Sequence, residues 1–391
     1  MADELAAIVA GGGIAGLASA IALRRAGWRV TVLERAPEFG EVGAGLGFGS
    51  YAMASLAALG VEREVRDAGR FAPHAGYQDP GGRWLLRIPG DGPAAGLAGV
   101  CGIHRQRLHE ILRRKAEADG AHLVTGAEVT AVRPGTPGAE PAVVAWKADG
   151  EEHDRECGLV VAADGVRSTV RSLLFPGVRV RYSRSTSWRA VIPCTSLSGL
   201  TEVWGPGTEF GAMPVSDDEV YWFGEFLHPE GASFPDELAE ARDRFADWSP
   251  WIRDLIAATA PDQIMRHDVY DIGAGCPRYA RGRAIVTGDA AHAMLPTIGQ
   301  GAATALEDGV CAGRLIGAPV AGGAELAGAL SSYDQARRPR CRRLARQAEL
   351  LARFGFELGP GWRQSARNTL LGLVPVGAAF KLGARLAAQP R

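Results

Sequence analysis

The chain has 391 residues, a net charge of −1 and 47% apolar residues. This length suits two domains, or one large domain with an insertion, and the near-neutral charge indicates neither a nucleic-acid partner nor a membrane partner. The six cysteines lie far apart without a Cys-x-x-Cys pair, so we expect free thiols and no metal site. Residues 1–4 are acidic and resemble no secretory signal, which favours a cytoplasmic protein.

Residues 5–35 have the pattern of a dinucleotide-binding βαβ unit. An apolar strand over residues 5–10 leads into a Gly-x-Gly-x-x-Gly turn at Gly11, Gly13 and Gly16, followed by a helix to about Ala26. A second strand, residues 29–33, ends at Glu34, eighteen residues beyond Gly16. The glycines allow a tight turn and close approach to a pyrophosphate, the helix start offers N–H groups, and a terminal acid can hold ribose hydroxyls.

Two more buried strands end in polar residues where open α/β sheets place their ligands. Residues 159–163 lead to Asp164 and Gly165, and residues 283–287 lead to Gly288 and Asp289. A long turn then enters a helix at about Ala302, whose first N–H groups can face an electron-rich ring edge. These ligand positions exceed what NAD requires and suit a longer cofactor such as FAD. The glycine-rich run over residues 36–50 either lies against a flat ligand or is a flexible loop.

The middle of the chain predicts a second kind of sheet. Residues 72–96 indicate a hairpin, residues 97–118 a helix, residues 123–146 strands, and residues 181–270 an aromatic-rich antiparallel sheet with one helix at residues 236–248. Strand alternation places Tyr221 and Trp222 on opposite faces, so at most one of them points toward a substrate.

The predicted architecture is α/β, with a Rossmann-type nucleotide domain, an inserted antiparallel-sheet substrate domain and C-terminal helices. The nucleotide domain is discontinuous and comprises residues 1–71, 97–180 and 271–350. Residues 72–96 and 181–270 form the substrate domain, and residues 351–391 form a helical segment packed on the body. The apolar stretch near the C-terminus is too short to span a bilayer.

Three motifs, in this order, resemble those of single-component FAD-dependent aromatic monooxygenases, the relatives of para-hydroxybenzoate, salicylate and 3-hydroxybenzoate hydroxylases. They are Gly11 to Gly16 with Glu34-Arg35, Asp164-Gly165 with Ser168 and Arg171, and Gly288-Asp289-Ala290-Ala291-His292 with Pro296, Gly299 and Gly301. The run Gly43-Ala44-Gly45-Leu46 and Arg105 also match positions that lie on the flavin in this family. The chain departs from the family at Ser50-Tyr51, where Pro-Asn is frequent, so the pocket shape there is not transferable.

The resemblance implies a set of FAD-binding residues. They are Gly11, Gly13, Ile14, Ala15, Gly16, Glu34, Arg35, Gly45, Leu46, Arg105, Asp164, Gly165, Gly288, Asp289, Pro296, Gly299, Gly301 and Ala302. Pro296 matches the residue beside the reactive edge of the flavin, and Arg189 and Tyr221 are candidate catalytic or substrate-contacting residues. Arg189 is alternatively a surface or flavin-contacting arginine.

The resemblance also implies a reaction. NAD(P)H reduces FAD without a separate nicotinamide domain, O2 forms a flavin C4a-hydroperoxide, and an electron-rich aromatic small molecule is hydroxylated. The working unit would be a monomer or homodimer.

Several alternatives remain at this point. An epoxidase, a prenyl-type reductase or a halogenase-like enzyme would use the same fold, although the halogenase motif Trp-x-Trp-x-Ile-Pro has Ala190 at its second Trp. A non-catalytic relative similar to GDP-dissociation inhibitors would keep only the fold. His292 is interpreted as a hydrogen-bonded residue that fixes its turn, and the arginines of residues 337–346 as a solvated helix face with some bridges to the core.

Overall fold

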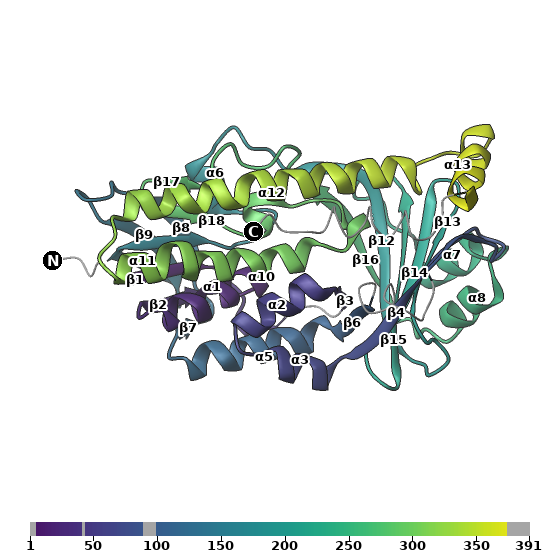
Figure 1. Cartoon of the computed structure of the whole chain (residues 1–391), viewed down its shortest axis with the longest axis horizontal. Coiled ribbons are helices and arrows are strands. Elements are labelled where there is room, and N and C mark those ends of the chain that lie inside the picture. Colours follow the sequence, from purple (N-terminus) through teal and green to yellow (C-terminus); the bar gives the residue numbers. More distant parts are fainter. Residues whose placement is uncertain (1–4, 41–43, 89–98, 374–391) are drawn as a thin grey trace.

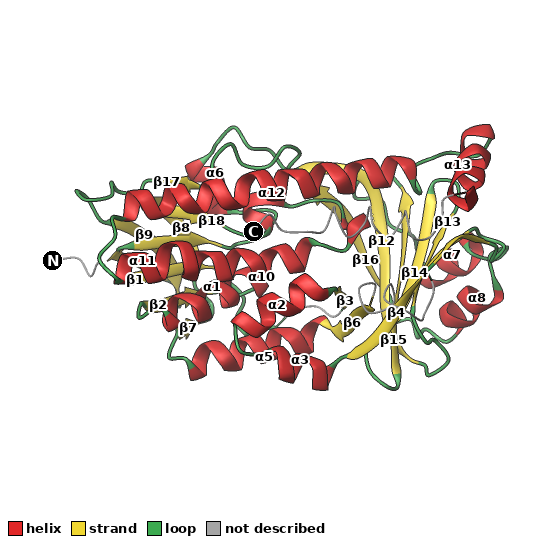
Figure 2. Cartoon of the chain, viewed as in Figure 1, coloured by secondary structure: helices red, strands yellow, loops and turns green. Residues whose placement is uncertain are grey.

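The computed structural model describes residues 5–40, 44–88 and 99–373. A parallel sheet lies at one end of the molecule and a larger sheet at the other, and a long C-terminal helix runs past both (Figures 1 and 2). Gly43 and residues 374–391 of the predicted C-terminal segment fall outside the described residues. Among those described, no helix combines the length and apolar character needed to cross a bilayer.

The first sheet has six strands, at the left of Figure 1. They are β1 (Ala6–Ala10), β2 (Arg29–Leu33), β7 (His122–Val124), β11 (Leu159–Ala162), β17 (Ala280–Arg281) and β18 (Ala284–Val286). Their order is β17-β18-β11-β1-β2-β7, with all pairs parallel except β17 with β18. From β1 the chain continues to β2, which pairs with one edge of β1, whereas β11 pairs with the other edge. A crevice at the carboxyl ends of these central strands follows from this reversal.

Helices pack around this sheet (Figure 2). They are α1 (Ile14–Arg25), α2 (Ser50–Ala58), α3 (Glu62–Ala68), α5 (Arg105–Ala118), α6 (Thr169–Leu174), α9 (Asp289–His292), α10 (Gly301–Cys311), α11 (Ala318–Ala321) and α12 (Leu326–Phe354). A 3-10 turn, η1 (Pro296–Ile298), precedes α10, and a π-helical segment, η2 (Ala312–Gly317), follows it. The predicted helix after the glycine turn and the helix predicted from about Ala302 are therefore both present.

Small residues let α1 and the α10–η2 helix approach closely. A Cβ atom added at Gly309 would lie 2.6 Å from Ala18, and one added at Gly313 would lie 2.7 Å from Ala22. These separations are far below van der Waals contact, so only glycine fits at this interface. The interface fixes the start of α10 relative to the glycine turn that begins α1.

A three-stranded antiparallel sheet is attached to this half. It consists of β8 (Glu128–Arg133), β9 (Ala142–Ala148) and β10 (Glu151–Cys157). The exposed outer strand β10 has mostly charged side chains, which suits a sheet edge in contact with water. The prediction of strands in residues 123–146 is confirmed.

The second large sheet joins distant parts of the chain. Its strands are β3 (Gly45–Phe48), β4 (Arg70–Gln78), β5 (Trp84–Arg87), β6 (Gly99–His104), β12 (Arg181–Pro193), β13 (Leu200–Trp204), β14 (Thr208–Pro214), β15 (Glu219–Leu227) and β16 (Met265–Asp271). The order is β16-β12-β15-β14-β13-β4-β6-β3, with β5 paired to β4. The predicted hairpin is thus β4–β5, and the sheet continues through β6 into β3.

Three details of the predicted elements were wrong. The helix predicted over residues 97–118 begins only at Arg105, because β6 precedes it and pairs with both β3 and β4. The helix predicted at residues 236–248 is the shorter α7 (Glu237–Arg244), and a second helix that was not predicted follows it, α8 (Pro250–Ala257), with Pro250 in its first turn. The sheet is not wholly antiparallel, because β13 runs parallel to β4.

The two faces of the large sheet differ in chemistry. One face carries Trp188, Phe210 and Trp222 into a mostly apolar core with α7 and α8. The indole N–H of Trp222 donates to the hydroxyl of Thr259, 2.9 Å away. Tyr221 belongs to a separate cluster on the opposite face, so the predicted separation of Tyr221 and Trp222 is confirmed. A final helix, α13 (Trp362–Leu373), lies at the far end of this sheet in Figure 1.

Candidate active site

The glycine turn after β1 is held by backbone contacts. Gly11 has φ +100°, and its N–H donates to the carbonyl of Leu33 at 2.8 Å. A Cβ at Gly11 would lie 2.4 Å from the carbonyl oxygen of Ala163, and one at Gly16 would lie 1.9 Å from the carbonyl oxygen of Gly11. Both positions therefore require glycine, as predicted for this turn.

The start of α1 is suited to an anion. Helix α1 begins at Ile14, and no described side chain caps the helix at Gly13. Ile14 and Ala15 are buried and have apolar side chains. The first N–H groups of the helix are therefore the polar groups that can bind a ligand at this end. Together with the helix dipole, these N–H groups give the helix start the properties that suit a phosphate.

Glu34 is fixed beside this turn. One of its carboxylate oxygens accepts the N–H of Gly12 at 2.7 Å, and the other accepts the N–H of Ala36 at 2.9 Å. The adjacent Arg35 is exposed. The acid predicted to hold ribose hydroxyls is thus held in one position by the backbone, and each oxygen keeps further lone pairs for a ligand.

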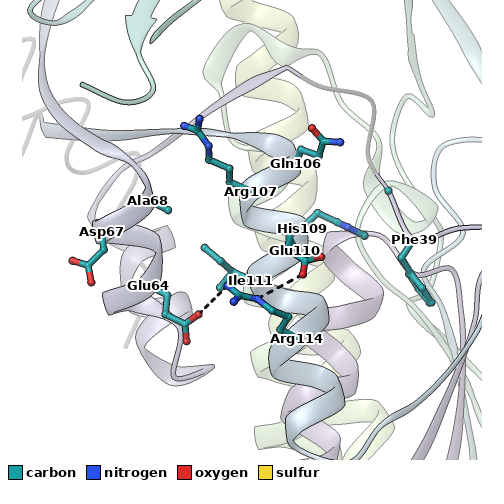
Figure 3. Close-up of a pocket in the computed structure, with 11 residues that line it drawn as sticks. Phe39, Glu64, Asp67, Ala68, Gln106, Arg107, His109, Glu110, Ile111 and Arg114 are labelled. Atoms are coloured by element: carbon teal, nitrogen blue, oxygen red, sulfur yellow. Dashed lines mark ion pairs between the residues drawn. The ribbon is translucent and has the colours of Figure 1, made fainter. Parts of the chain in front are cut away.

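A cavity of about 680 Å³ adjoins the outer side of this turn, between α3 and α5 (Figure 3). His109 and Phe39 line it, and His109 Nε2 lies 2.8 Å from the carbonyl oxygen of Gly12. Ion pairs of Arg114 with Glu64 and Glu110 cross its wall. None of the residues predicted to bind FAD or substrate is among those lining it, so its position does not make it the reaction chamber.

The Asp164 turn at the end of β11 is held internally. The Asp164 carboxylate accepts the hydroxyl of Ser168 and the N–H of Val170, and burial raises its pKa. Ser168 in turn accepts the N–H of Arg171 at 2.8 Å and caps α6. Gly165, with φ +80°, completes the turn. Asp164 therefore shapes the loop, and the Gly165 backbone is the part suited to a ligand.

Arg171 connects the Asp164 turn to the turn at Gly288 and Asp289. Its buried guanidinium donates to the carbonyl of Val166 at 2.6 Å and to that of Ala290 at 3.3 Å. The ends of β11 and β18 are thereby tied together, although they are more than a hundred residues apart in sequence. Beside this tie, Asp289 is exposed at the first position of α9, where its carboxylate can accept hydroxyl groups.

The loop from Pro296 to the start of α10 borders open space. Gly299 has φ +61°, and a Cβ at Gly299 or Gly301 would meet no atom within 4 Å. Helix α10 begins at Gly301 without a side-chain cap among the described residues, and Ala302 follows in its first turn. The loop thus presents backbone N–H groups and a helix N-terminus to a space that a planar ligand could fill.

A buried ionic network joins the turn at Gly288 to helices α10 and α12. His292 Nε2 lies 2.6 Å from Asp308 Oδ2, which also accepts the N–H of Gly288 at 2.7 Å. Arg337 donates to Asp308 Oδ1 at 2.6 Å and to Glu307 at 2.9 Å, and Arg340 makes two further bonds to Glu307. Although burial opposes it, the neighbouring cations hold the pKa of Asp308 down to about 2.

This network accounts for two features of the sequence. His292, Asp308 and Cys341 lie close enough for a metal ion, but the Arg337 guanidinium already occupies Asp308 and contacts Cys341 at 3.7 Å. A second cation there would be repelled, so the cluster is structural. The interpretation of His292 as the residue that fixes its turn agrees with these contacts, as does the bridging of Arg337 and Arg340 to the core.

Strand β3, which carries the predicted flavin-binding residues Gly45 and Leu46, belongs to the large sheet and packs against its face. A Cβ at Gly45 would lie 2.2 Å from Cγ of Tyr221, and one at Gly47 would lie 3.1 Å from Sδ of Met213. Tyr221 of β15 is therefore buried against Gly45 of β3. Burial raises the pKa of its phenol, against the opposing effect of Arg189, so the hydroxyl stays protonated near neutral pH.

Arg189 lies on the same sheet face as Tyr221. It is half-buried, and its cross-strand neighbours are Phe223 on β15 and Met265 on β16. Burial lowers the pKa of His267, and the nearby Arg189 and Arg105 guanidiniums lower it further. The face thus combines a cation, a neutral imidazole, a phenol and apolar side chains.

Two buried glutamates on this face were not anticipated from the sequence. Glu209 and Glu225 are direct cross-strand partners, and both are almost fully buried. Burial raises the pKa of Glu225 to about 7, although Ser185 donates a 2.6 Å hydrogen bond to it. The pKa of Glu209 is raised well above its usual range by burial and by Glu225. The available signal was a glutamate inside each of two mostly apolar strands, but the cross-strand register was needed to pair Glu209 with Glu225.

The comparisons with known proteins follow this geometry. The sequence matches a family model described as "FAD binding domain" over residues 4–348. The chain belongs to this family.

Members of the FAD-binding family resemble the chain over most of its length. Aurachin C monooxygenase/isomerase from Stigmatella aurantiaca is 38% identical over 344 residues, covering 86% of each chain. The 2-heptyl-3-hydroxy-4(1H)-quinolone synthase of Pseudomonas aeruginosa is 32% identical and covers 97% of each chain. The structure of Klebsiella pneumoniae HpxO complexed with FAD and uric acid is similar with a TM-score of 0.83 at 26% identity, covering 98% of this chain and 96% of that one.

Family membership and these relatives establish the activity class. The chain is an FAD-dependent monooxygenase that uses NAD(P)H and O2 and hydroxylates aromatic or other electron-rich small molecules. None of these relatives is named a halogenase, a reductase or a non-catalytic binding protein, so those alternatives are not favoured. The predicted Rossmann-type α/β fold is confirmed.

Proposed function

We propose that this FAD-dependent monooxygenase hydroxylates a nitrogen-containing fused aromatic ring that carries an alkyl chain, of the 4(1H)-quinolone type. The observation that carries the proposal is the similarity along nearly the whole chain to a relative named for making 2-heptyl-3-hydroxy-4(1H)-quinolone. A 3-hydroxylating monooxygenase must start from the same ring without the 3-hydroxyl group. We further expect a cytoplasmic enzyme that acts as a monomer or homodimer and has no nucleic-acid partner.

The cofactor part of the proposal uses the residues predicted from the sequence. The glycine turn and the start of α1 would hold the pyrophosphate, Glu34 the adenosine ribose, and Asp289 the ribityl hydroxyls. The open space at Gly299 and Gly301 fits a planar ring beside Pro296, with the start of α10 placed to stabilise negative charge on it. When bound, FAD supplies the reduction by NAD(P)H and the activation of O2.

The substrate part uses the sheet face that carries Tyr221 and Arg189. Tyr221, Phe223 and Met213 would provide apolar contact and exclude water from the ring. Arg189 would donate to the ring carbonyl oxygen, and the neutral His267 could accept a ring N–H. This arrangement suits a heterocycle that has both a carbonyl and an N–H group.

The test is a substrate comparison with purified, FAD-loaded protein. We expect 2-heptyl-4(1H)-quinolone to accelerate NAD(P)H oxidation and to gain one oxygen atom by mass spectrometry, with uric acid and salicylate much less effective. Running the assay with NADH and with NADPH identifies the reductant. Flavin reduction without oxygenation of any quinolone would contradict the substrate class and leave the cofactor assignment intact.

A paired substitution tests the cofactor residues separately. Asp289→Ala should weaken FAD binding by about tenfold, because one hydrogen-bonding carboxylate is lost, with little change in thermal unfolding of the apoprotein. Asp262→Ala, which removes an exposed carboxylate elsewhere, is the control. Equal FAD affinity in both variants would contradict the role given to Asp289.

A further inference from the structure

The face of the large sheet to which we assign substrate binding carries Arg189 together with a pair of buried glutamates. Tyr221, Phe223 and Glu225 alternate along β15, so their side chains share this face. Cross-strand pairing adds Arg189 opposite Phe223 and Glu209 opposite Glu225. A cation and two carboxyl groups therefore lie beside each other where we place the substrate ring.

The charges of these groups converge on the phenol of Tyr221. Burial is the main cause of its raised pKa, but Arg189 and Arg105 act to lower that pKa, and Glu225 and Glu209 act to raise it. Arg105 is one of the residues that we expect to contact FAD. The carboxyl pair is thus within electrostatic reach of the part of the sheet that is nearest to the flavin.

Glu225 is held in place by hydroxyl groups and not by a cation. Ser185 donates to one of its carboxyl oxygens at 2.6 Å, and the hydroxyl of Ser183 lies 2.9 Å from that of Ser185. Glu225 has no ion pair with a described residue, and its other oxygen has no hydrogen bond within the described part of the chain. Because no cation neutralises this carboxyl group at contact distance, its charge remains available to act on a ligand.

Arg189 likewise has no ion pair with any described residue. Its Nε donates to the hydroxyl of Ser187 at 3.4 Å, and Ser187 is the cross-strand partner of Glu225. Arg189 and Glu225 are therefore diagonal neighbours on adjacent strands, within reach of each other for long side chains. In agreement with this placement, Arg189 lowers the pKa of Glu225, against the larger effect of burial. An ionised Glu225 thus offsets the positive charge of Arg189.

The other ionisable groups around Glu225 supply no cation for it. Burial and the nearby guanidiniums lower the pKa of His267, and burial and the charge of Glu225 raise the pKa of Glu209 well above its usual range, so both are neutral near pH 7. The remaining groups are acids that have partners of their own, Glu357 with Arg184 at 3.6 Å and Glu202 with the His74 imidazole at 3.1 Å. Glu225 is therefore the acid whose charge sets the balance with Arg189.

We infer that Glu225 offsets the charge of Arg189 and makes this site select neutral rings over rings that carry a carboxylate group. A neutral heterocycle leaves the two opposite charges balanced, while its carbonyl oxygen accepts a hydrogen bond from Arg189. A carboxylate would add a second negative charge close to Glu225 in a buried setting, where like charges repel strongly. The inference rests on the proposed substrate face and adds ligand charge as a rule of selection.

Protonation of Glu225 should relax this selection. Burial raises the pKa of Glu225 to about 7, so the residue loses its charge as the pH falls through that value. Arg189 is then no longer offset, whereas the carboxylate of a ligand, with an ordinary pKa of about 4, stays ionised. The affinity for a carboxylate ligand should therefore rise between about pH 8 and about pH 6, and the affinity for a neutral ligand of the same shape should not.

The experiment compares carboxylates with the carboxamides of the same ring. The ligands are 4-oxo-1,4-dihydroquinoline-2-carboxylate and its carboxamide, with benzoate and benzamide as a second pair. Their affinities for the FAD-loaded full chain are measured without NAD(P)H, from the change that binding causes in flavin absorbance. At about pH 8 we expect the carboxamide to bind at least about tenfold more tightly than the carboxylate.

Substitution of Glu225 should change this preference. At about pH 8, Glu225→Gln should increase the affinity for the carboxylate by about tenfold and that for the carboxamide by less than about twofold, because only the charge is removed. Glu225→Asp retains the charge and should retain the preference. Glu151→Gln, on the exposed strand β10, is the matched control and should bind both ligands as the wild type does.

Three results would overturn the inference. One is equal wild-type affinity for carboxylate and carboxamide at about pH 8. The second is no gain by either carboxylate in Glu225→Gln, which includes the case in which no carboxylate binds. The third is a wild-type affinity for the carboxylate that does not rise toward about pH 6, and this series needs no variant to fold.

Failure of the proposed function gives a different result. If no quinolone binds but benzoate gains affinity in Glu225→Gln, the quinolone substrate class is contradicted and the role of Glu225 is supported. If the quinolone is oxygenated but the preference is the same in Glu225→Gln, the substrate class is supported and the role of Glu225 is overturned. Equal FAD content in all variants shows that a changed preference reflects the charge and not misfolding.

Discussion

The two faces of the large sheet are built from alternating residues of the same strands, yet they differ in polarity. Toward α7 and α8 the face is mostly apolar, with Trp188, Phe210 and Trp222 fully buried. The opposite face mixes Tyr221 and Met213 with Arg189, His267 and a glutamate pair. A shift of one residue along a strand therefore separates the core that stabilises the fold from the face to which we assign substrate binding.

Removing a large side chain from the apolar face should give the largest effect on stability. Trp222→Ala should lower the free energy of unfolding by about 3–5 kcal/mol, because it leaves a cavity and removes the hydrogen bond that the Trp222 indole donates to Thr259. Chemical denaturation measures this change. Trp362→Ala, at a 76% exposed tryptophan, is the control and should change stability by less than about 0.5 kcal/mol. A comparable loss in both variants would contradict the assignment of that face to the core.

On the polar face, Glu225 should make stability depend on pH. Its pKa is raised to about 7, so the folded state holds the proton more tightly than the unfolded state does. Its contribution is complete below pH 4.5 and is lost as the pH rises through about 7, by an amount on the order of 3 kcal/mol. Glu225→Gln should flatten this dependence in thermal melts across the range, whereas Glu151→Gln on exposed β10 should not. An unchanged slope in Glu225→Gln would show that another group titrates.

The contact of Gly45 on β3 with Tyr221 on β15 is tested by substitution. Gly45→Ala places a Cβ against the Tyr221 ring and should cost about 1–3 kcal/mol through overpacking. It should also alter the visible spectrum of bound flavin, because Gly45 and Leu46 of β3 are among the residues that we expect to contact FAD. Gly49→Ala meets no atom within 4 Å and is the matched control. If the two variants unfold alike, Gly45 is not confined as the structure indicates.

The smallest expected effect is on activity alone. Arg189→Ala should lower kcat/KM for the quinolone by about tenfold, equivalent to about 1.4 kcal/mol, with FAD content and thermal unfolding unchanged. Arg253→Ala, in α8 behind the apolar face, should leave kcat/KM as it is. Full activity of Arg189→Ala would assign this arginine to a surface role, the alternative left open by the sequence.

Local patterns in the sequence predicted the parts of the molecule that depend on neighbouring residues. The glycine turn at Gly11, the strand ends at Asp164 and Asp289, and the alternation at Tyr221 all follow from spacing within a few residues. The sequence did not indicate β6, because Gly99–His104 gains its strand conformation from pairing with β3 and β4. A short glycine-containing segment before a strong helical stripe has no local signal for such pairing.

The buried polar pairs that were not predicted also depend on residues that are distant in the sequence. Glu209 meets Glu225 only through the register of β14 and β15, and Arg337 meets Asp308 from a helix 29 residues further along the chain. Neither pair has a spacing that identifies it in the sequence. The role of Asp164 in closing its own turn likewise depends on where α6 begins.

The most direct test of the central claim is a crystal structure of the enzyme with FAD and 2-heptyl-4(1H)-quinolone. We predict that the flavin ring lies beside Pro296 and the start of α10, and that the quinolone ring lies between it and the sheet face of Tyr221 and Arg189. A quinolone bound elsewhere, for example in the cavity between α3 and α5, would contradict the claim that this face of the sheet is the site of the chemistry.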